Sequence, residues 1–405
     1  MDPLKCQALI LKIASRCNLN CDYCYIYNKG DYTYLKQPKL MSNEVVDAII
    51  ERVKEHCSLH DQKFFEFVFH GGEPLLAPRE FFKSFVGKAR ERLKGIKVGF
   101  TLQTNGVLLD NEWCKTLGLL DISVGVSIDG LQETHDLHRK YHNGNGSYYD
   151  TIRGLKIAQN SPFLRNNVGI LMVIDVESDP VEVYNQLRFL GTRYINFLLP
   201  YGNYENTPTG LLYQERKEGK TLYADWLIEI FNIWWHSDQK IEIRIFKQVV
   251  ELILGIDNGF EYWGQRRSEF LVIETDGSIE AVGALKLCGH GFTKADMNVL
   301  NNTIDDALET ELAKNYQLSH EILCQQCQEC PVVEVCGGGF FPHRYRSSNG
   351  FNNPSVYCLN LLKLITHIQN VVLDTMPKEL ISEGEMEKLT FSIIKEEYIE
   401  SFTYI

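Results

Sequence analysis

The chain has 405 residues, of which 44% are hydrophobic and 23% are charged. These values are typical of a folded protein with a real core, and they exclude a largely disordered chain. The net charge of −12 gives no basic surface for phosphate backbones, so we expect no nucleic-acid partner. No apolar run approaches the roughly 18 residues of a membrane span, and the amino-terminal segment does not read as a signal peptide. We therefore expect a cytoplasmic protein without a membrane partner.

Cysteine is the residue type that departs from the average. The chain has 12 cysteines, and most of them fall into two groups, one within residues 17–24 and one within residues 288–358. In a reducing compartment such groups bind metal or take part in chemistry more often than they form disulfides. The cysteines therefore direct the search for a functional site.

From residue 8 to about residue 200, apolar runs of strand length alternate with amphipathic helical stretches. The predicted strands are 8–14, 64–69, 97–102, 122–128, 168–174 and 194–199. The predicted helices lie near 42–57, 79–94, 110–119, 147–160 and 180–190. This alternation predicts an α/β fold with a parallel sheet, a partial (β/α)6 barrel of the TIM type. In such barrels the carboxyl ends of the strands build the active site.

The second half of the chain reads differently. A long polar connection over 200–218 is followed by an aromatic-rich helix over 222–235, and a hairpin is predicted over 270–279. We expect three parts: a barrel over 1–240, a small cysteine-rich domain over 241–370, and a helical tail over 371–405.

The first cysteine group stands immediately after the first predicted strand. Cys17, Cys21 and Cys24 form a C-x3-C-x2-C triplet. Three thiolates on one loop suit a [4Fe–4S] cube with one iron left open for a ligand. Zinc with a remote fourth ligand, or buried thiols without a role, are the alternatives.

The triplet and the turns after later strands resemble the radical S-adenosylmethionine (SAM) enzymes. This resemblance implies that Cys17, Cys21 and Cys24 hold a [4Fe–4S] cluster whose open iron binds S-adenosylmethionine. Further cofactor-binding residues that it implies are Gly71, Gly72 and Glu73 after the second strand, Asn105 after the third, and Ser127 and Asp129 at the end of the fourth. The implied chemistry is reductive cleavage of the cofactor to a 5′-deoxyadenosyl radical, which removes a hydrogen atom from the substrate.

The second cysteine group resembles the SPASM extension of peptide-modifying radical enzymes. By this resemblance Cys327, Cys330, Cys336 and Cys358 bind an auxiliary [4Fe–4S] cluster. The family's next motif cysteine is Phe340 here, and another is Val282, so we expect one complete auxiliary cluster. Cys288 and Cys324 are left over as possible ligands of a second site. Structural zinc is the alternative for the four-cysteine set.

Two classes of SPASM enzyme are candidates for the function. One oxidises a cysteine or serine of sulfatases to formylglycine, and its members carry an aspartate directly after the cysteine that aligns with Val282, where this chain has Gly283. The other matures ribosomally made peptides by crosslinking.

The stretch from Cys327 to Cys358 is similar to maturases that form cyclophanes, in which an aromatic ring is bonded to the β-carbon of a residue two positions away. We therefore predict a radical SAM peptide maturase that forms such a crosslink. The sulfatase-maturing reaction is the alternative, and a non-catalytic metal-binding scaffold is the alternative from another class.

The resemblance implies two partners, a ribosomally made precursor peptide and a protein that donates single electrons. No catalytic base stands out from the sequence. His343 and Tyr345, in a His-Arg-Tyr run near the second cysteine group, are weak candidates for handling protons, and a packed turn is the favoured reading of that run.

Overall fold

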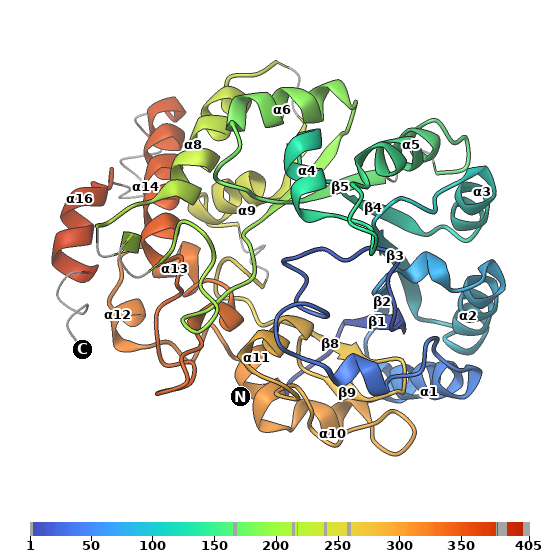
Figure 1. Ribbon diagram of the computed structural model, residues 1–405. Coiled ribbons are helices and arrows are strands. Elements are labelled where there is room, and N and C mark those ends of the chain that lie inside the picture. The colour runs from blue at the N-terminus through green and yellow to red at the C-terminus, as the bar shows by residue number, and fades with distance from the viewer. Residues whose placement is uncertain are drawn as a thin grey trace. The chain divides into compact units, whose positions relative to one another are not determined.

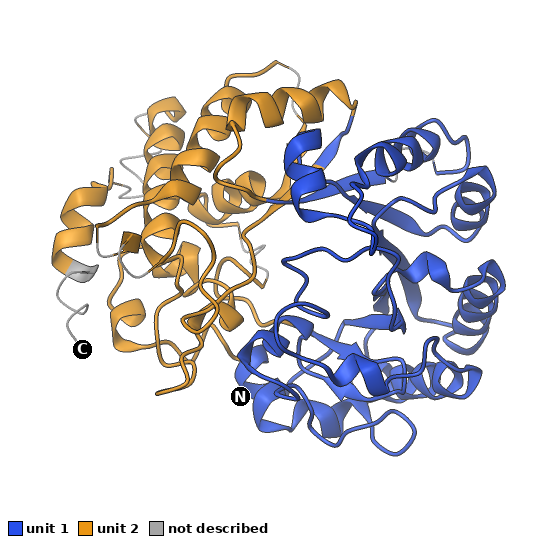
Figure 2. Ribbon diagram, in the orientation of Figure 1, with its two compact units in different colours: residues 1–173, 192–194, 269–317 blue, residues 174–191, 195–268, 318–405 orange. Residues whose placement is uncertain are grey.

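The computed structural model describes residues 3–164, 168–212, 215–216, 218–238, 241–256, 261–377, 379 and 387–399. The chain forms two compact units (Figure 2). Unit 1 comprises residues 1–173, 192–194 and 269–317, and unit 2 comprises residues 174–191, 195–268 and 318–405. No helix in the described ranges is long and apolar enough to cross a membrane.

Unit 1 is built on a mostly parallel sheet. Its strands are β1 (Ala8–Ala14), β2 (Phe64–Gly71), β3 (Lys97–Thr104), β4 (Ser123–Ser127), β5 (Val168–Val173), β8 (Phe270–Ile273) and β9 (Ile279–Glu280). They lie in the order β5-β4-β3-β2-β1-β8-β9, and every neighbouring pair is parallel except β8 and β9. The predicted strands and the α/β fold with a partial TIM-like parallel sheet are therefore confirmed.

The two faces of this sheet differ because side chains alternate along each strand. On β2, Phe65, Phe67 and Phe69 are fully buried, and the rings of Phe67 and Phe69 pack against Phe85 of helix α2 (Arg79–Arg92). Helices α1 (Asn43–Leu59), α2, α3 (Asn111–Leu119) and α5 (Tyr148–Gln159) lie along this outer face (Figure 1). The other face carries polar side chains and is covered by the loop that follows β1.

Local signals in the sequence explain where these helices begin. The side chains of Ser42 and Asp110 accept hydrogen bonds from the backbone N–H groups of Val45 and Trp113 and so cap α1 and α3. Each cap satisfies a donor that would otherwise lack a partner at a helix start. Unit 1 also contains α4 (Gln132–His138), α10 (Ile304–Leu308) and α11 (Glu311–Gln317), of which α4 falls within the barrel and was not predicted.

Unit 2 holds most of the remaining elements. They are α6 (Pro180–Phe189), β6 (Tyr194–Leu198, whose first residue belongs to unit 1), α8 (Leu222–Trp235), β7 (Glu242–Ile243), α9 (Arg244–Ile253), α12 (Gln325–Gln328), α13 (Val333–Cys336), α14 (Cys358–Thr375) and α16 (Phe391–Ile394). Helix α14 packs on α8 and α9. Part of the predicted helical tail, residues 378, 380–386 and 400–405, lies outside the described residues.

The predicted hairpin forms, with β8 and β9 antiparallel, but it does not stand apart from the barrel sheet. β8 pairs in parallel with β1, Ala8 opposite Phe270 and Leu11 opposite Ile273, so the hairpin extends the sheet of unit 1. The two units are defined by contacts within the folded chain. The domain boundaries expected from the sequence, near residues 240 and 370, divide the chain by motif and not by contacts, and they stay a prediction.

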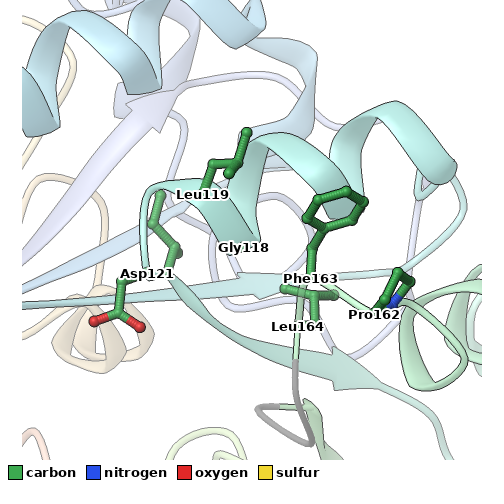
Figure 3. A pocket seen from close by; sticks show the side chains of 7 residues that line it. Gly118, Leu119, Asp121, Pro162, Phe163 and Leu164 are labelled. Carbon is green, nitrogen blue, oxygen red and sulfur yellow. The ribbon is translucent and has the colours of Figure 1, made fainter.

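A pocket of about 270 Å³ opens in unit 1 beside the turns that precede β4 and β5 (Figure 3). Its lining residues are Gly118, Leu119, Asp121, Ile122, Pro162, Phe163 and Leu164. These turns lie at the amino ends of the strands, whereas the cysteine loop follows the carboxyl end of β1. The pocket is therefore at the edge of the sheet that stabilises the barrel, away from the edge that carries chemistry.

Candidate metal centres

The first cysteine loop begins three residues after β1 ends. Within it the Cys24 N–H donates to the carbonyl of Cys21 (3.1 Å), and the Asn28 N–H donates to the carbonyl of Cys24 (2.9 Å). These turns gather the three sulfurs of Cys17, Cys21 and Cys24 closely enough to influence one another electrostatically. The structure thus brings the predicted triplet together.

Burial controls the protonation of these thiols. It raises the pKa of Cys17 to about 12 and that of Cys21 to about 11, and nearby negative charges, that of Glu73 on Cys17 among them, add to the effect. Without metal the thiols are therefore protonated at neutral pH. Binding of iron would release their protons, so assembly of the site is expected to depend on pH.

The turn at Gly71, Gly72 and Glu73 lies directly against the start of the cysteine loop. The Gly72 N–H donates to the carbonyl of Ala14 (2.8 Å), and the Glu73 N–H donates to the carbonyl of Arg16 (3.0 Å). A Cβ atom on Gly72 would lie 2.3 Å from the Arg16 carbonyl oxygen, so only glycine fits. The close approach of two backbones explains the glycine at this position.

The Glu73 carboxylate is fully buried and its hydrogen bonds are directed into the protein. It accepts from the N–H of Leu75 (3.0 Å), the hydroxyl of Thr104 (2.7 Å) and the N–H of Asn105 (2.8 Å). Glu73 therefore holds the Thr104-Asn105 turn. The Asn105 amide in turn donates to Asn18 Oδ1 (2.7 Å) and lies 3.8 Å from the sulfur of Cys17.

Asp129 anchors the cysteine loop from the end of β4. Its carboxylate accepts from the hydroxyl of Tyr23, which lies between Cys21 and Cys24, and from the N–H of Val173 (3.2 Å). The guanidinium of buried Arg139 donates to the same tyrosine oxygen (2.7 Å). A cation and a carboxylate therefore meet at Tyr23 and fix the loop.

Two further polar groups occupy the inner face of the sheet. Ser127 Oγ accepts from the side-chain amide of Gln103 on the adjacent strand (2.8 Å). Lys12 Nζ donates to the hydroxyl of Tyr25 (2.7 Å) and lies 3.1 Å from Nδ1 of His70, which also accepts from the Gly71 N–H (2.8 Å). Burial lowers the pKa of Lys12 to about 8.

Sequence reasoning missed Lys12, Tyr23, Gln103 and Arg139. The first signal that would have found one of them is a lysine in an otherwise apolar strand, because a buried lysine is rare without a partner. The contact between Tyr23 and Arg139 joins residues 116 positions apart, and no local sequence pattern predicts it.

The second group of cysteines gathers in unit 2. Cys327 lies in α12, Cys330 in the turn that follows, Cys336 at the end of α13 and Cys358 at the start of α14. The sulfur of Cys358 is electrostatically coupled to those of Cys336 and Cys330, and that of Cys327 to those of Cys358 and Cys336. The structure thus brings together the four cysteines predicted as one ligand set.

The two leftover cysteines belong to different units. Cys288 ends the 3-10 helix η3 (Gly283–Cys288) in unit 1. Cys324 is the N-cap residue of α12 in unit 2, and its carbonyl accepts from the Cys327 N–H (3.0 Å). Phe340 and Val282, which stand where the family has cysteines, are buried apolar residues. The ring of Phe340 stacks on that of Tyr262 with centroids 4.4 Å apart.

His343 and Tyr345 are packed in unit 2. The His343 side chain is 1% exposed, its ring lies 4.8 Å from that of Tyr357 and 5.0 Å from that of Phe340, and burial lowers its pKa to about 3. The Tyr345 ring packs on Phe351 with centroids 5.3 Å apart. A proton-handling role for either stays a prediction.

The spacing of the sulfurs distinguishes a cluster from a single metal ion. In a tetrahedral zinc site with Zn–S bonds of about 2.3 Å, the sulfurs lie about 3.8 Å apart. Among the described residues no three cysteine sulfurs lie within 4.8 Å of one another. A cube spreads its thiolates over separate iron atoms and so does not require the spacing of a single-ion site.

One trio of residues within the described ranges has single-ion spacing, His56, His60 and Asp305. The Cys6 N–H donates to Nε2 of His56 (3.0 Å), so the proton of that ring sits on Nδ1 and points to Asp305 (2.9 Å). His60 Nε2 lies 2.7 Å from the other carboxylate oxygen. The trio is a hydrogen-bonded link between α1 and α10, and His56 has no lone pair free for a metal.

The chain is similar to known proteins over most of its length. The Radical SAM superfamily model matches residues 11–187. A serine-type anaerobic sulfatase-maturating enzyme of Bacteroides thetaiotaomicron is 26% identical over 392 residues, covering 93% of this chain and 92% of that protein. A cysteine-type enzyme of Clostridium perfringens is 28% identical over 353 residues, covering 84% and 89%.

A solved structure titled as native anSMEcpe with bound AdoMet and Cp18Cys peptide has the same fold. It superposes with a TM-score of 0.75 at 24% identity, covering 91% of this chain and 99% of that one.

The Radical SAM superfamily model covers the barrel with its cysteine loop, and the findings support a radical SAM enzyme. The cofactors expected from the sequence, a [4Fe–4S] cluster with S-adenosylmethionine and an auxiliary iron–sulfur cluster, are confirmed for this class.

The prediction of cyclophane formation is wrong. The relatives that match over 84–93% of the chain include sulfatase-maturating enzymes of both the serine and the cysteine type. The stretch on which the prediction depended, Cys327 to Cys358, contains the residues that gather as cluster ligands. Such a stretch reports how a cluster is held and carries little information about the substrate.

Proposed function

We propose that the chain oxidises a cysteine or serine side chain of a sulfatase polypeptide to formylglycine. The observation that carries this proposal is the match to sulfatase-maturating enzymes over 84–93% of the chain, far more than the barrel alone. A match restricted to the barrel would support only the radical chemistry. The substrate is thus a polypeptide, and a protein that donates single electrons is the second partner.

The oxidation removes one hydrogen from the side-chain β-carbon and one from its oxygen or sulfur. Serine then gives the aldehyde directly, whereas cysteine gives a thioaldehyde that water converts to the aldehyde with release of hydrogen sulfide. In the proposed enzyme one leaves as a hydrogen atom and the other as a proton, and an electron leaves with the proton. When bound, the cluster and S-adenosylmethionine at Cys17, Cys21 and Cys24 supply the radical that takes the hydrogen atom, and the auxiliary cluster at Cys327, Cys330, Cys336 and Cys358 accepts the electron.

The residues of unit 1 have defined tasks in this proposal. Glu73 and Asp129 fix the cysteine loop through Asn105 and Tyr23, so the cofactor is held in one orientation. The backbone of Gly71 and Gly72 and the side chains of Asn105 and Ser127 offer polar groups around it. Orientation matters because a carbon radical attacks whatever hydrogen is nearest.

The proton requires an acceptor other than an aspartate at position 283. A Cβ atom on Gly283 would lie 3.0 Å from the ring and the hydroxyl of Tyr25, so the tyrosine fills the space that a longer side chain would need. The same hydroxyl accepts from Lys12 Nζ. We assign the proton to the deprotonated fraction of Lys12, which burial makes available near neutral pH by lowering the pKa of that side chain to about 8.

The direct test uses anaerobically reconstituted enzyme, dithionite, S-adenosylmethionine and two synthetic peptides. Each peptide spans the modified site of a sulfatase, one with cysteine and one with serine at that site. Mass spectrometry should show an aldehyde in at least one peptide, and an alanine peptide should stay unchanged. Cleavage of S-adenosylmethionine without aldehyde in either peptide would overturn the proposed substrate while leaving the radical chemistry intact.

A further inference from the structure

The middle residue of the His343-Arg344-Tyr345 run is a buried cation. Arg344 ends the 3-10 helix η4 (Phe341–Arg344), in unit 2, and is 1% exposed. Its guanidinium donates Nη1–H to the carbonyl of Ser319 (2.7 Å), Nε–H to that of Gly338 (3.0 Å), and Nη2–H groups to those of Gly337 and Gly339 (both 2.8 Å). Four backbone carbonyls thus surround the guanidinium.

Every one of these acceptors is neutral. Among the described residues no carboxylate lies within 4.0 Å of the Arg344 guanidinium. Arg267 of the same unit, by contrast, forms an ordinary ion pair with Glu321 (2.8 Å). A buried charge without a counter-charge costs several kcal/mol. A compensating negative charge is therefore needed close to Arg344.

The thiols of the second cysteine group supply that charge once iron is bound. The guanidinium is electrostatically coupled to the sulfurs of Cys327, Cys336 and Cys324, and the loop that it binds, 337–339, follows Cys336 directly. Four thiolates around a cube give the site a net negative charge, and reduction by one electron makes it more negative still.

We propose that Arg344 is the counter-charge of the auxiliary cluster and raises its reduction potential. A fixed positive charge stabilises the reduced, more negative state more than the oxidised one, so it favours uptake of an electron. Arg344 acts through the cluster and is a positioning residue. The inference rests on the auxiliary cluster of the proposed function and is independent of the substrate.

The same contacts explain the three successive glycines. Gly337, Gly338 and Gly339 all have positive φ angles, 58°, 76° and 67°, which turns their carbonyls toward one guanidinium. A Cβ atom on Gly338 would lie 2.7 Å from Nη2 of Arg344. The glycine run is thus a binding loop for the arginine side chain.

The test is a redox titration of the full-length, anaerobically reconstituted protein, followed by electron paramagnetic resonance (EPR) without peptide or S-adenosylmethionine. Arg344→Met should lower the equilibrium constant for reduction of the auxiliary cluster at least tenfold, about 59 mV for one electron. Arg346→Met is the matched control, because Arg346 packs over the ring of Tyr204 at 4.3 Å, on the same turn, and should leave the potential unchanged.

Arg344→Lys separates the effect of the positive charge from the effect of the four hydrogen bonds. Lysine keeps the positive charge and cannot reproduce the planar fork that reaches four carbonyls. If Arg344 acts by charge, the lysine variant keeps iron and a potential close to wild type even where the methionine variant loses its iron. Equal loss of iron in both variants, or an Arg344→Met potential no lower than that of Arg346→Met, would overturn the inference.

Failure of this inference is distinguishable from failure of the proposed function. The potential and the iron content are measured without a substrate, so they do not depend on which peptide is oxidised. An iron count of about four per chain in the wild type would remove the auxiliary cluster, and the inference with it.

Discussion

Both cysteine sites are expected to hold an iron–sulfur cluster, but the charged groups that fix their loops differ. In unit 1 the three-cysteine loop is fixed by carboxylates, Glu73 and Asp129, acting through Asn105 and Tyr23. In unit 2 the four cysteines surround a region with a buried cation, Arg344, held by backbone carbonyls. A site with three thiolates leaves an iron open for a cofactor, whereas a site with four is closed and is suited to moving electrons. The number of cysteines thus separates the two roles, and the surroundings differ in the groups that fix each loop.

The largest expected effect comes from removing one cysteine at each site. Cys21→Ala should abolish formation of 5′-deoxyadenosine from S-adenosylmethionine, because the open iron is lost. Cys336→Ala should keep that cleavage, lose about half of the iron, from about eight to about four per chain, and stop peptide oxidation. Chromatography of dithionite-reduced samples and iron assays measure both outcomes.

Cys114→Ala is the control for this pair, because Cys114 is a buried thiol of α3 without a partner role in either site. It should keep both iron content and cleavage. Loss of cleavage in Cys336→Ala as complete as in Cys21→Ala would erase the distinction between an open and a closed site.

The next effect tests how tightly the backbone packs around the open site. Gly72→Ala should destabilise the protein by about 3 kcal/mol, because its Cβ would collide with the Arg16 carbonyl and the Tyr27 hydroxyl. Gly87→Ala in the exposed middle of α2 has no atom within 4 Å of its Cβ and should stabilise by about 0.5–1 kcal/mol. Urea denaturation of both variants measures the difference, and equal effects would refute the close packing.

Tyr23→Phe tests the anchor of the cysteine loop. Removal of the hydroxyl leaves Asp129 and Arg139 buried without the group that joins them, and should cost about 2 kcal/mol in unfolding free energy. The variant should also lose iron faster during exposure to a chelator. Tyr149→Phe, on an exposed ring, should change neither quantity.

A smaller effect depends on pH. His135 in α4 accepts from the Asp129 N–H at Nδ1 (3.3 Å) and lies 3.1 Å from Ser147 Oγ at Nε2, and burial lowers its pKa to about 3. The unfolded histidine, with a pKa near 6.5, binds a proton that the folded one does not. Stability is therefore complete above pH 6.5 and falls as the pH decreases toward 3, by roughly 1–2 kcal/mol at pH 5.

His135→Gln removes this contribution. Unfolding free energies of wild type and variant at pH 7 and pH 5 should therefore converge at the lower pH. A wild type that loses no more stability than the variant between these values would contradict the assignment of a neutral, hydrogen-bonded His135.

The sequence predicted the features that depend on local pattern. Strand periodicity located β1 to β6, because the alternation of neighbouring residues determines it, and the cysteine spacing picked out two groups that the fold gathers. The sequence did not predict the pairing of β8 with β1, the role of Arg139 or that of Arg344. Each of these depends on contacts between distant segments or, for Arg344, on a glycine loop whose shape appears only when folded.

The prediction of the specific reaction was wrong for a related reason. The prediction of a cyclophane-forming enzyme depended on the stretch from Cys327 to Cys358, whose cysteines are the expected ligands of an auxiliary cluster, and several reaction classes can share such a site. The evidence for sulfatase maturation came from similarity along the whole chain.

One measurement tests the contrast between the two sites most directly, the EPR spectrum of the reduced protein with and without S-adenosylmethionine. The account predicts two cluster signals, of which the cofactor changes only the one that Cys21→Ala removes. A cofactor that changes the signal removed by Cys336→Ala, or that changes neither signal, would contradict it.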